Sequence, residues 1–139
     1  MECYMQVVIK ITFTPDMLCN DNLLLLQDKY NNTILRDIYI KHVDSIVEKQ
    51  GGRILHNGQI QYNFTTECYV INPCINKVYN LQITSINKMG ALHKHELVTV
   101  FIPIQYYNDV VPEVGMYFSV EIIGKRIEDS IVCVGKIIQ

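Results

Sequence analysis

The chain has 139 residues, 49% of them hydrophobic, and 12 basic against 14 acidic side chains give a formal net charge of −2. This length and composition indicate one domain, or two small ones sharing a core, and exclude an intrinsically disordered chain. The charge balance lacks the basic excess that nucleic-acid binders usually carry.

Several other classes of protein also lack their sequence signals. No apolar run approaches the ~20 residues that span a bilayer. The N-terminal MECYMQVVIKITF has neither a basic lead nor a small-residue cleavage site, so we expect no signal peptide. No C-x-x-C pair occurs, so no structural zinc site is indicated. We expect a reducing, intracellular compartment, in which most of the five cysteines are small buried thiols; they are Cys3, Cys19, Cys68, Cys74 and Cys133.

The first half of the chain predicts a strand, a helix and two further extended regions. Residues 4–13 alternate between apolar and polar, the period of a half-buried strand. A helix is expected from about Asp16 to Asn31. Pro15 suits the first turn of a helix, and the negative charge of Asp16 is favourable at the positive, N-terminal end of the helix dipole. Extended regions follow at 34–47 and 59–71. The side chains expected to face a core are Met5, Val7, Ile9, Ile11 and Phe13 in the first strand and Ile60, Tyr62, Phe64, Thr66, Cys68 and Val70 in the last.

Two apolar segments of this half stand out. The run Leu23–Leu26 is wider than one helical stripe, so part of it is expected to meet a second surface, although each leucine could instead complete the chain's own core. Gly51-Gly52 and Asn57-Gly58 are expected to form two turns. Ile54 and Leu55 between them would be exposed on a loop tip or folded back onto their own sheet.

The second half predicts a small antiparallel barrel. Residues 79–103 indicate three strands, with a tight turn at Met89-Gly90. A loop follows at 105–115, and residues 116–127 and 131–138 predict two more strands joined by a hairpin turn. Five short strands in about sixty residues are typical of an oligonucleotide-binding (OB) barrel.

The order and spacing of several short segments resemble the seventh subunit of eukaryotic RNA polymerase II and its archaeal counterpart. The segments are Gly52-Arg53-Ile54-Leu55, Asn57-Gly58, Tyr62-Asn63-Phe64, Cys68-Tyr69-Val70-Ile71-Asn72-Pro73, Ile86-Asn87-Lys88-Met89-Gly90 and Val100-Phe101-Ile102. The resemblance covers nearly the whole chain. It implies an α+β, mostly β architecture: a tip domain at 1–72, an antiparallel sheet with one helix, and a five-stranded OB barrel at 73–139. The chain is shorter than cellular members, which suggests a compact version encoded by a large DNA virus, or else a divergent cellular subunit.

The resemblance also implies where partners bind. The tip would dock on the polymerase core, and a small helical partner subunit would pack against the helix and the outer side of strand 4–13. Nascent RNA would contact the barrel weakly, through aromatic and basic residues. The core-docking residues would be Pro15, Gly52, Arg53, Ile54, Leu55, Asn57 and Gly58, the partner-binding residues Leu23, Leu24 and Leu26, and the RNA-binding residues Lys88, His93, Lys94, His95, Phe101, Tyr106 and Tyr107.

We therefore expect a non-catalytic stalk subunit of a DNA-directed RNA polymerase, which supports initiation and transcript handling. No nucleophile elbow, Walker loop, G-x-G-x-x-G or paired-carboxylate signature occurs, and no cofactor, metal or membrane is implied. The location would be the virion and cytoplasmic virus factory for a viral protein and the nucleus for a cellular one. The alternative is a free-standing OB protein that binds single-stranded RNA or DNA.

Overall fold

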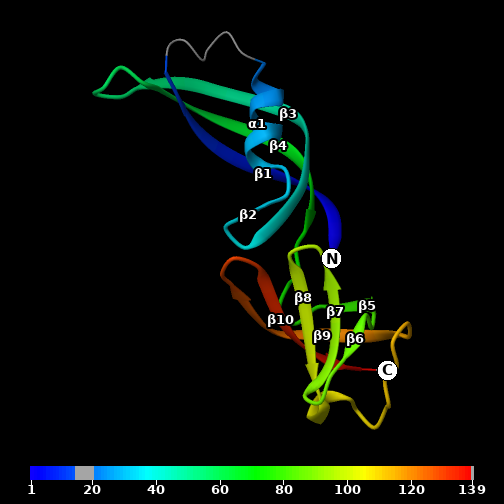
Figure 1. Ribbon diagram of the computed structural model, residues 1–139. Helices are drawn as coiled ribbons and strands as arrows, with labels where there is room; N and C mark the ends of the chain where they lie inside the picture. The colour runs from blue at the N-terminus through cyan, green and yellow to red at the C-terminus, as the bar shows by residue number, and fades with distance from the viewer. Residues whose placement is uncertain (15–20, 139) are drawn as a thin grey trace. The chain divides into compact units, whose positions relative to one another are not determined.

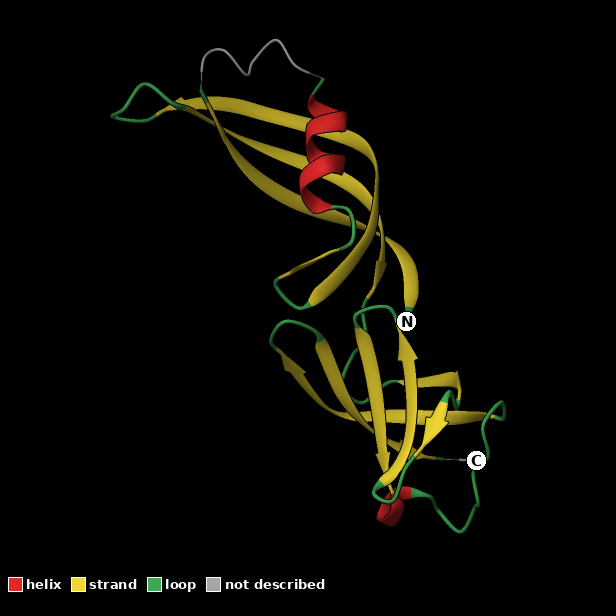
Figure 2. Ribbon diagram, in the orientation of Figure 1, coloured by secondary structure: helices red, strands yellow, loops and turns green. Residues whose placement is uncertain are grey.

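The computed structural model describes residues 1–14 and 21–138. They form a mostly β chain with two sheets and one α-helix (Figures 1 and 2). The elements are β1 (Glu2–Phe13), α1 (Asn22–Tyr30), β2 (Thr33–Leu35), β3 (Ile38–Ile54), β4 (Ile60–Ile71), β5 (Val78–Gln82), β6 (Ser85–Ile86), β7 (Gly90–His95), β8 (Val98–Pro103), a short 3-10 helix (Ile104–Tyr106), β9 (Tyr117–Ile127) and β10 (Ile131–Ile137).

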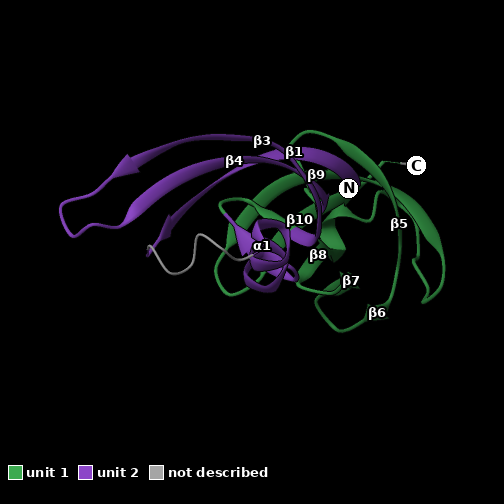
Figure 3. Ribbon diagram, turned by 90° about the horizontal axis from the view of Figure 1, so that it is seen from above, with its two compact units in different colours: residues 1, 36–39, 71–139 green, residues 2–35, 40–70 purple. Residues whose placement is uncertain are grey.

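Two compact units divide the chain (Figure 3). One consists of residues 2–35 and 40–70, and we call it the sheet unit. The other consists of residues 1, 36–39 and 71–138, and we call it the barrel unit because its sheet is curled. The expected mostly β architecture, with one helix after the first strand and a separate second sheet, is confirmed at this level.

The sheet unit holds an antiparallel four-stranded sheet in the order β1-β4-β3-β2. The helix α1 packs against it: Leu26 is fully buried, and the Gln27 Nε2 atom donates to the carbonyl oxygen of Val43 at 3.0 Å. Alternation in β1 and β4 follows the predicted faces, with Phe13 and Phe64 among the fully buried side chains. Met5 shares the predicted face with Val7 by alternation, but it lies near the start of β1 and is 38% exposed, so it is not part of the core.

The helix begins later than the sequence pattern predicts. Asp21 is its N-cap, and the Asp21 Oδ1 atom accepts hydrogen bonds from the backbone N–H groups of Leu23 at 3.0 Å and Leu24 at 3.4 Å. A side-chain oxygen at this position satisfies N–H groups that the first turn cannot pair internally. The predicted helical start at Asp16 lies outside the described residues, and so does Pro15.

The barrel unit holds a six-stranded sheet in the order β5-β9-β10-β8-β7-β6. Its strands pair antiparallel except for β10 and β8, which are parallel. The two outermost strands, β5 and β6, are consecutive segments of one stretch, residues 78–86. Between them, the N–H of Ile83 donates to the carbonyl oxygen of Met116 at 2.8 Å, and the N–H of Thr84 donates to the carbonyl oxygen of Leu92 at 2.8 Å. One short stretch of chain therefore joins both ends of the curled sheet.

The interior of the barrel unit is apolar and tightly packed. A Cβ atom added at Gly90 would lie 2.1 Å from the carbonyl oxygen of Ile102, so only glycine fits at the start of β7. The side chain of Asn87 supports this turn, since its Oδ1 accepts from the N–H groups of Met89 at 2.8 Å and Gly90 at 3.1 Å. The buried side chains of this unit include Leu81, Ile83, Ala91, Val98, Val100, Ile102, Val120, Ile122, Ile131, Cys133 and Ile137.

Candidate functional site

Strands β7 and β8 place basic and aromatic side chains on the outer surface of the curled sheet. The register pairs Lys94 with Thr99 and Leu92 with Phe101. The alternating positions Val98, Val100 and Ile102 of β8 are fully buried. Because neighbours along a strand point to opposite faces, the four paired side chains lie outside.

Strands β10 and β9 extend these pairs into two rows across the sheet. In β10, Val132 is the cross-strand neighbour of Thr99 on one side and of Arg126 of β9 on the other. Val134 is likewise the neighbour of Phe101 and of Gly124. We call these the mixed row and the apolar row. The mixed row is Lys94, Thr99, Val132 and Arg126, and the apolar row is Leu92, Phe101, Val134 and Gly124.

The two rows suit a flat aromatic ligand attached to anionic groups. The half-buried ring of Phe101 stands between two aliphatic side chains, and Gly124 at the end of the row adds no side chain to obstruct a base. The mixed row begins with one cation and ends with another, although the guanidinium of Arg126 also forms an ion pair with Glu128. Stacking on an aromatic ring together with cations for phosphates is the chemistry that binds single strands.

The predicted RNA-binding histidines do not belong to this surface. His93 is paired with the buried Val100 and so lies on the opposite face from Lys94. One of its ring nitrogens, Nδ1, lies 2.7 Å from the carbonyl oxygen of Gln82. His95 shares the face of His93, two positions along the strand. Among residues 1–14 and 21–138, no group of three His, Cys, Asp or Glu side chains could hold a metal ion.

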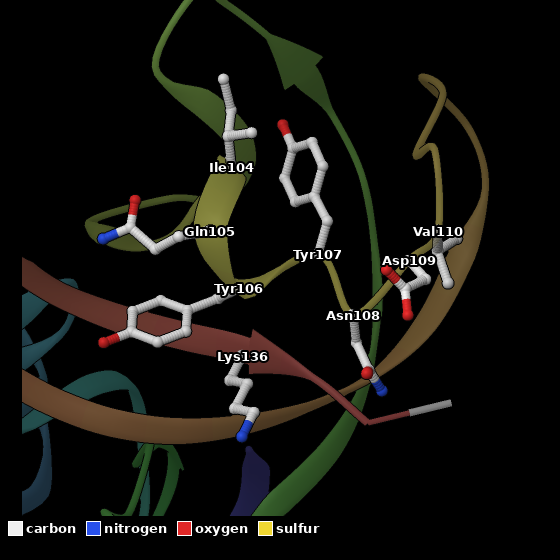
Figure 4. Close-up of a pocket in the computed structure, with 8 residues that line it drawn as sticks. All are labelled: Ile104, Gln105, Tyr106, Tyr107, Asn108, Asp109, Val110 and Lys136. Carbon is white, nitrogen blue, oxygen red and sulfur yellow. The ribbon is translucent and has the colours of Figure 1, made fainter.

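The remaining predicted RNA-binding residues lie on turns and on the loop after β8. Lys88 is exposed in the turn that precedes β7. A surface concavity of about 510 Å³ is formed by residues 104–110 and Lys136 (Figure 4). In Figure 4 the ring of Tyr106 lies alongside Lys136, whereas Tyr107 points away from both. Burial raises the pKa of the Tyr107 hydroxyl above the ordinary tyrosine value, which itself lies well above neutral pH.

The predicted docking tip is a long hairpin, with one turn in place of two. Gly51 and Gly52 lie within β3, so the prediction of a turn there is wrong; both residues continue the extended strand to Ile54. The turn comes after it, where Gly58 (φ 79°) donates its N–H to the carbonyl of Leu55 at 3.0 Å. The side chain of Ile54 is 76% exposed, and Arg53 and Asn57 are also exposed. Pro15, also predicted to dock, is outside the described residues.

The three predicted partner-binding leucines have different environments. Leu26 is fully buried in the core of its own unit, so its side chain is not available to a partner. Leu23 is half-buried and Leu24 is 55% exposed. The leucine run is therefore shared between the core and the surface, as a helix with one buried stripe requires.

Sequence reasoning missed six contributors to the outer surface: Leu92, Thr99, Gly124, Arg126, Val132 and Val134. Their places depend on which strand neighbours which, and the parallel pairing of β10 with β8 has no local signal in the sequence. Lys125 was also missed. Its Nζ atom donates to the carbonyl oxygens of Asp37 at 2.6 Å and Pro73 at 2.9 Å and lies 3.5 Å from Asn72 Oδ1, which ties three segments of the barrel unit together.

No protein-family model matches this chain, and no curated protein matches it. In the part of the chain that the structure describes, no helix has the length and apolar character to span a bilayer.

Proposed function

We propose that this protein is a non-catalytic stalk subunit of a DNA-directed, multi-subunit RNA polymerase, related to the seventh subunit of RNA polymerase II. The observation that carries the proposal is the order of its parts. A sheet unit with one helix precedes a curled sheet along the chain, in the order that the family's tip domain and barrel follow, and the family-like segments fall in that order too.

We further propose that the curled sheet is an OB fold. With β5 and β6 counted as one bent strand, the strands in chain order are first β5–β6, second β7, third β8, fourth β9 and fifth β10. The sheet then has the order 1-2-3-5-4-1, with the third and fifth strands parallel. A barrel of five strands with Greek-key connections is the OB architecture, and its second and third strands form the usual ligand-binding surface.

The tip hairpin is the proposed contact with the polymerase core. A strongly exposed isoleucine at the end of a long hairpin costs solvation free energy unless a partner covers it. The half-buried Leu55 follows it, and its N–H donates to the carbonyl of Gln59 at 2.8 Å, which holds the turn. We therefore assign the apolar part of the docking contact to Ile54 and Leu55.

Affinity capture tests this role. The tagged protein, captured from its native cells or particles and washed at high salt, should bring down the two largest polymerase subunits in near-equal amounts. Replacing Ile54 and Leu55 together by aspartate should abolish that recovery without unfolding the chain. The matched control is Val47→Asp, an equally polar change at an exposed position of the same strand, and it should leave recovery intact. Recovery that survives the double change would refute the tip contact.

A second candidate function, an independent single-strand binder, is favoured by the apolar row and its neighbouring cations. RNA affinity of the isolated protein at physiological salt separates the two. Residues 69–139 carry six basic and six acidic side chains, so a stalk subunit with this neutral barrel should bind weakly, because it makes few phosphate contacts. Submicromolar binding, reduced about tenfold by Phe101→Ala, would support the free-standing role. Tyr117→Ala is the control, since that side chain is 62% exposed on β9 outside both rows.

A further inference from the structure

The first strand, β1, forms one edge of the four-stranded sheet and carries several exposed apolar side chains. Tyr4 is 63% exposed, Met5 38% and Val8 48%. Natural edge strands are usually protected from pairing with another chain by proline, by bulges or by several charges. In its twelve residues β1 contains no proline, and its charged side chains are Glu2 and Lys10.

These two charges make β1 complementary to itself in one direction. Parallel pairing in register with a second copy would place Glu2 against Glu2 and Lys10 against Lys10, which is destabilising. Antiparallel pairing about a two-fold axis at Gln6 instead places Glu2 opposite the partner's Lys10. A shift of the register by two residues in either direction loses this pairing of opposite charges.

The same register also matches the apolar side chains on both faces of the sheet. On the outer face it places Tyr4 opposite the partner's Val8, an aromatic and β-branched pair of the kind that stabilises neighbouring strands. On the face that packs on the core, it places the partly exposed Met5 beside the partner's Val7. The charge pattern and the apolar pattern therefore select one register.

We propose that two copies of this chain associate through β1, antiparallel and centred on Gln6, so that their four-stranded sheets join into one. The occupant of this edge is thus a second copy of the same protein. The association belongs to the isolated chain, so it goes beyond the proposed polymerase role and is tested without polymerase. Failure to capture polymerase subunits would not contradict association through β1, and a monomeric chain would not contradict the polymerase role.

Analytical ultracentrifugation of the full chain gives the first test. We expect a monomer–dimer equilibrium, and Lys10→Glu should raise its dissociation constant about tenfold because two opposite-charge pairs become like-charge pairs. The single change is placed at Lys10 because Glu2 also contacts Lys41 at 3.3 Å and Tyr69 at 2.8 Å in its own copy. Adding Glu2→Lys should restore association. Lys77→Glu, the same charge change at an exposed site of the barrel unit, should have no effect.

Disulfide trapping gives the second test and fixes the register. Only residue 6 faces itself across the proposed axis, and paired Cα atoms lie about 5.5 Å apart, within the range that a disulfide bridges. In a Cys3→Ser, Cys19→Ser background, Gln6→Cys should form a covalent dimer on mild oxidation. Thr12→Cys, on the same face of the same strand, should not, since its two copies lie far apart. A chain that stays monomeric at every concentration, or equal trapping at both positions, would overturn the proposal.

Discussion

The two units of this protein complete their sheets in different ways. In the barrel unit, both ends of the six-stranded order belong to one stretch of chain, residues 78–86, which pairs with β9 at one end and with β7 at the other. In the sheet unit, the four-stranded order ends on β1 at one side and on the three-residue β2 at the other, and one nine-residue helix packs against it.

Because of this difference, we expect the barrel unit to be the more stable one and the sheet unit to bind protein partners. A curled sheet whose ends are joined hides most of its backbone hydrogen-bonding groups, so its outer surface can vary without exposing an edge. An open sheet with a single short helix keeps an edge and a long hairpin available. The proposed contacts with protein partners accordingly lie on the sheet unit, and the candidate surface for single strands lies on the barrel unit.

The largest expected effect comes from Phe64→Ala in the sheet unit. The Phe64 side chain is fully buried, with its ring centroid 6.0 Å from that of Phe13 and 6.2 Å from that of Tyr62. Truncating a buried phenylalanine costs about 3–5 kcal/mol, which approaches the whole stability of a small unit. Amide hydrogen exchange should show lost protection in β1, β3 and β4, with β8 to β10 still protected.

The matched control for Phe64→Ala is Val47→Ala, since Val47 lies on β3 of the same sheet but is 53% exposed. It should change the free energy of unfolding by less than about 0.5 kcal/mol. If Phe64→Ala removes protection from both units together, they unfold as one cooperative body, and the contrast between them does not extend to stability.

The second prediction concerns the barrel unit and compares two glycines. Gly90→Ala should destabilise by about 1–3 kcal/mol, because its Cβ atom must displace the backbone carbonyl of Ile102. Gly51→Ala in β3 is the counterpart in the sheet unit: nothing lies within 4 Å of its added Cβ, so the free energy of unfolding should barely change. Chemical denaturation of both variants measures the difference, and equal costs would contradict the packing argument.

Local pattern was sufficient to predict most elements. Strict alternation found β1 and β4, and the apolar runs after residue 78 found β5, β7, β8, β9 and β10 within a few residues of their observed bounds. These predictions succeeded because alternation reports which side chains are buried in a strand. The turn predicted at Gly51-Gly52 rested on the glycines alone and was wrong: both residues continue a strand, because glycine permits a turn but does not require one.

The candidate surface could be predicted only in part. Lys94 and Phe101 were identified as basic and aromatic residues of barrel strands, and the structure places them on one face. The separation of His93 from Lys94 follows from alternation along β7, a local rule that the prediction of both as RNA-binding residues did not apply. Val134 and Gly124 come from strands distant in sequence, so the place of these two residues on the face of Lys94 and Phe101 depends on register. Register depends on long-range pairing, which composition and local periodicity do not report.

A smaller effect is expected at the helix cap of the sheet unit. Asp21→Ala removes the oxygen that accepts from the N–H groups of Leu23 and Leu24, at a cost of about 1 kcal/mol. Asp28→Ala is the control, because this aspartate lies within the helix, away from its cap. Thermal unfolding should show a lower midpoint for the first variant alone. Because α1 belongs to the sheet unit, exchange protection in β8 and β10 should not change, and a change there would show that the helix also supports the barrel unit.

The smallest perturbation is a chemical label on two buried thiols of the described residues, Cys68 in the sheet unit and Cys133 in the barrel unit. Burial raises the pKa of the Cys68 thiol, and it raises that of Cys133 to about 11, so both are protonated at pH 8 and unreactive until their unit opens. The exposed Cys3 should react at once with a maleimide, and peptide mass spectrometry should then show Cys68 labelled before Cys133. The reason is that an open sheet with one covering helix opens at a lower free energy than a sheet whose two ends are joined. Labelling of Cys133 first would reverse the ranking and make the sheet unit, with its exposed edge, the more stable part of the chain.

The buried Cys133 thiol should also make the stability of the chain depend on pH. Since its raised pKa favours the protonated thiol in the folded state, the free energy of unfolding should fall as the pH rises from about 9 towards 11. Cys133→Ala should remove that part of the pH dependence.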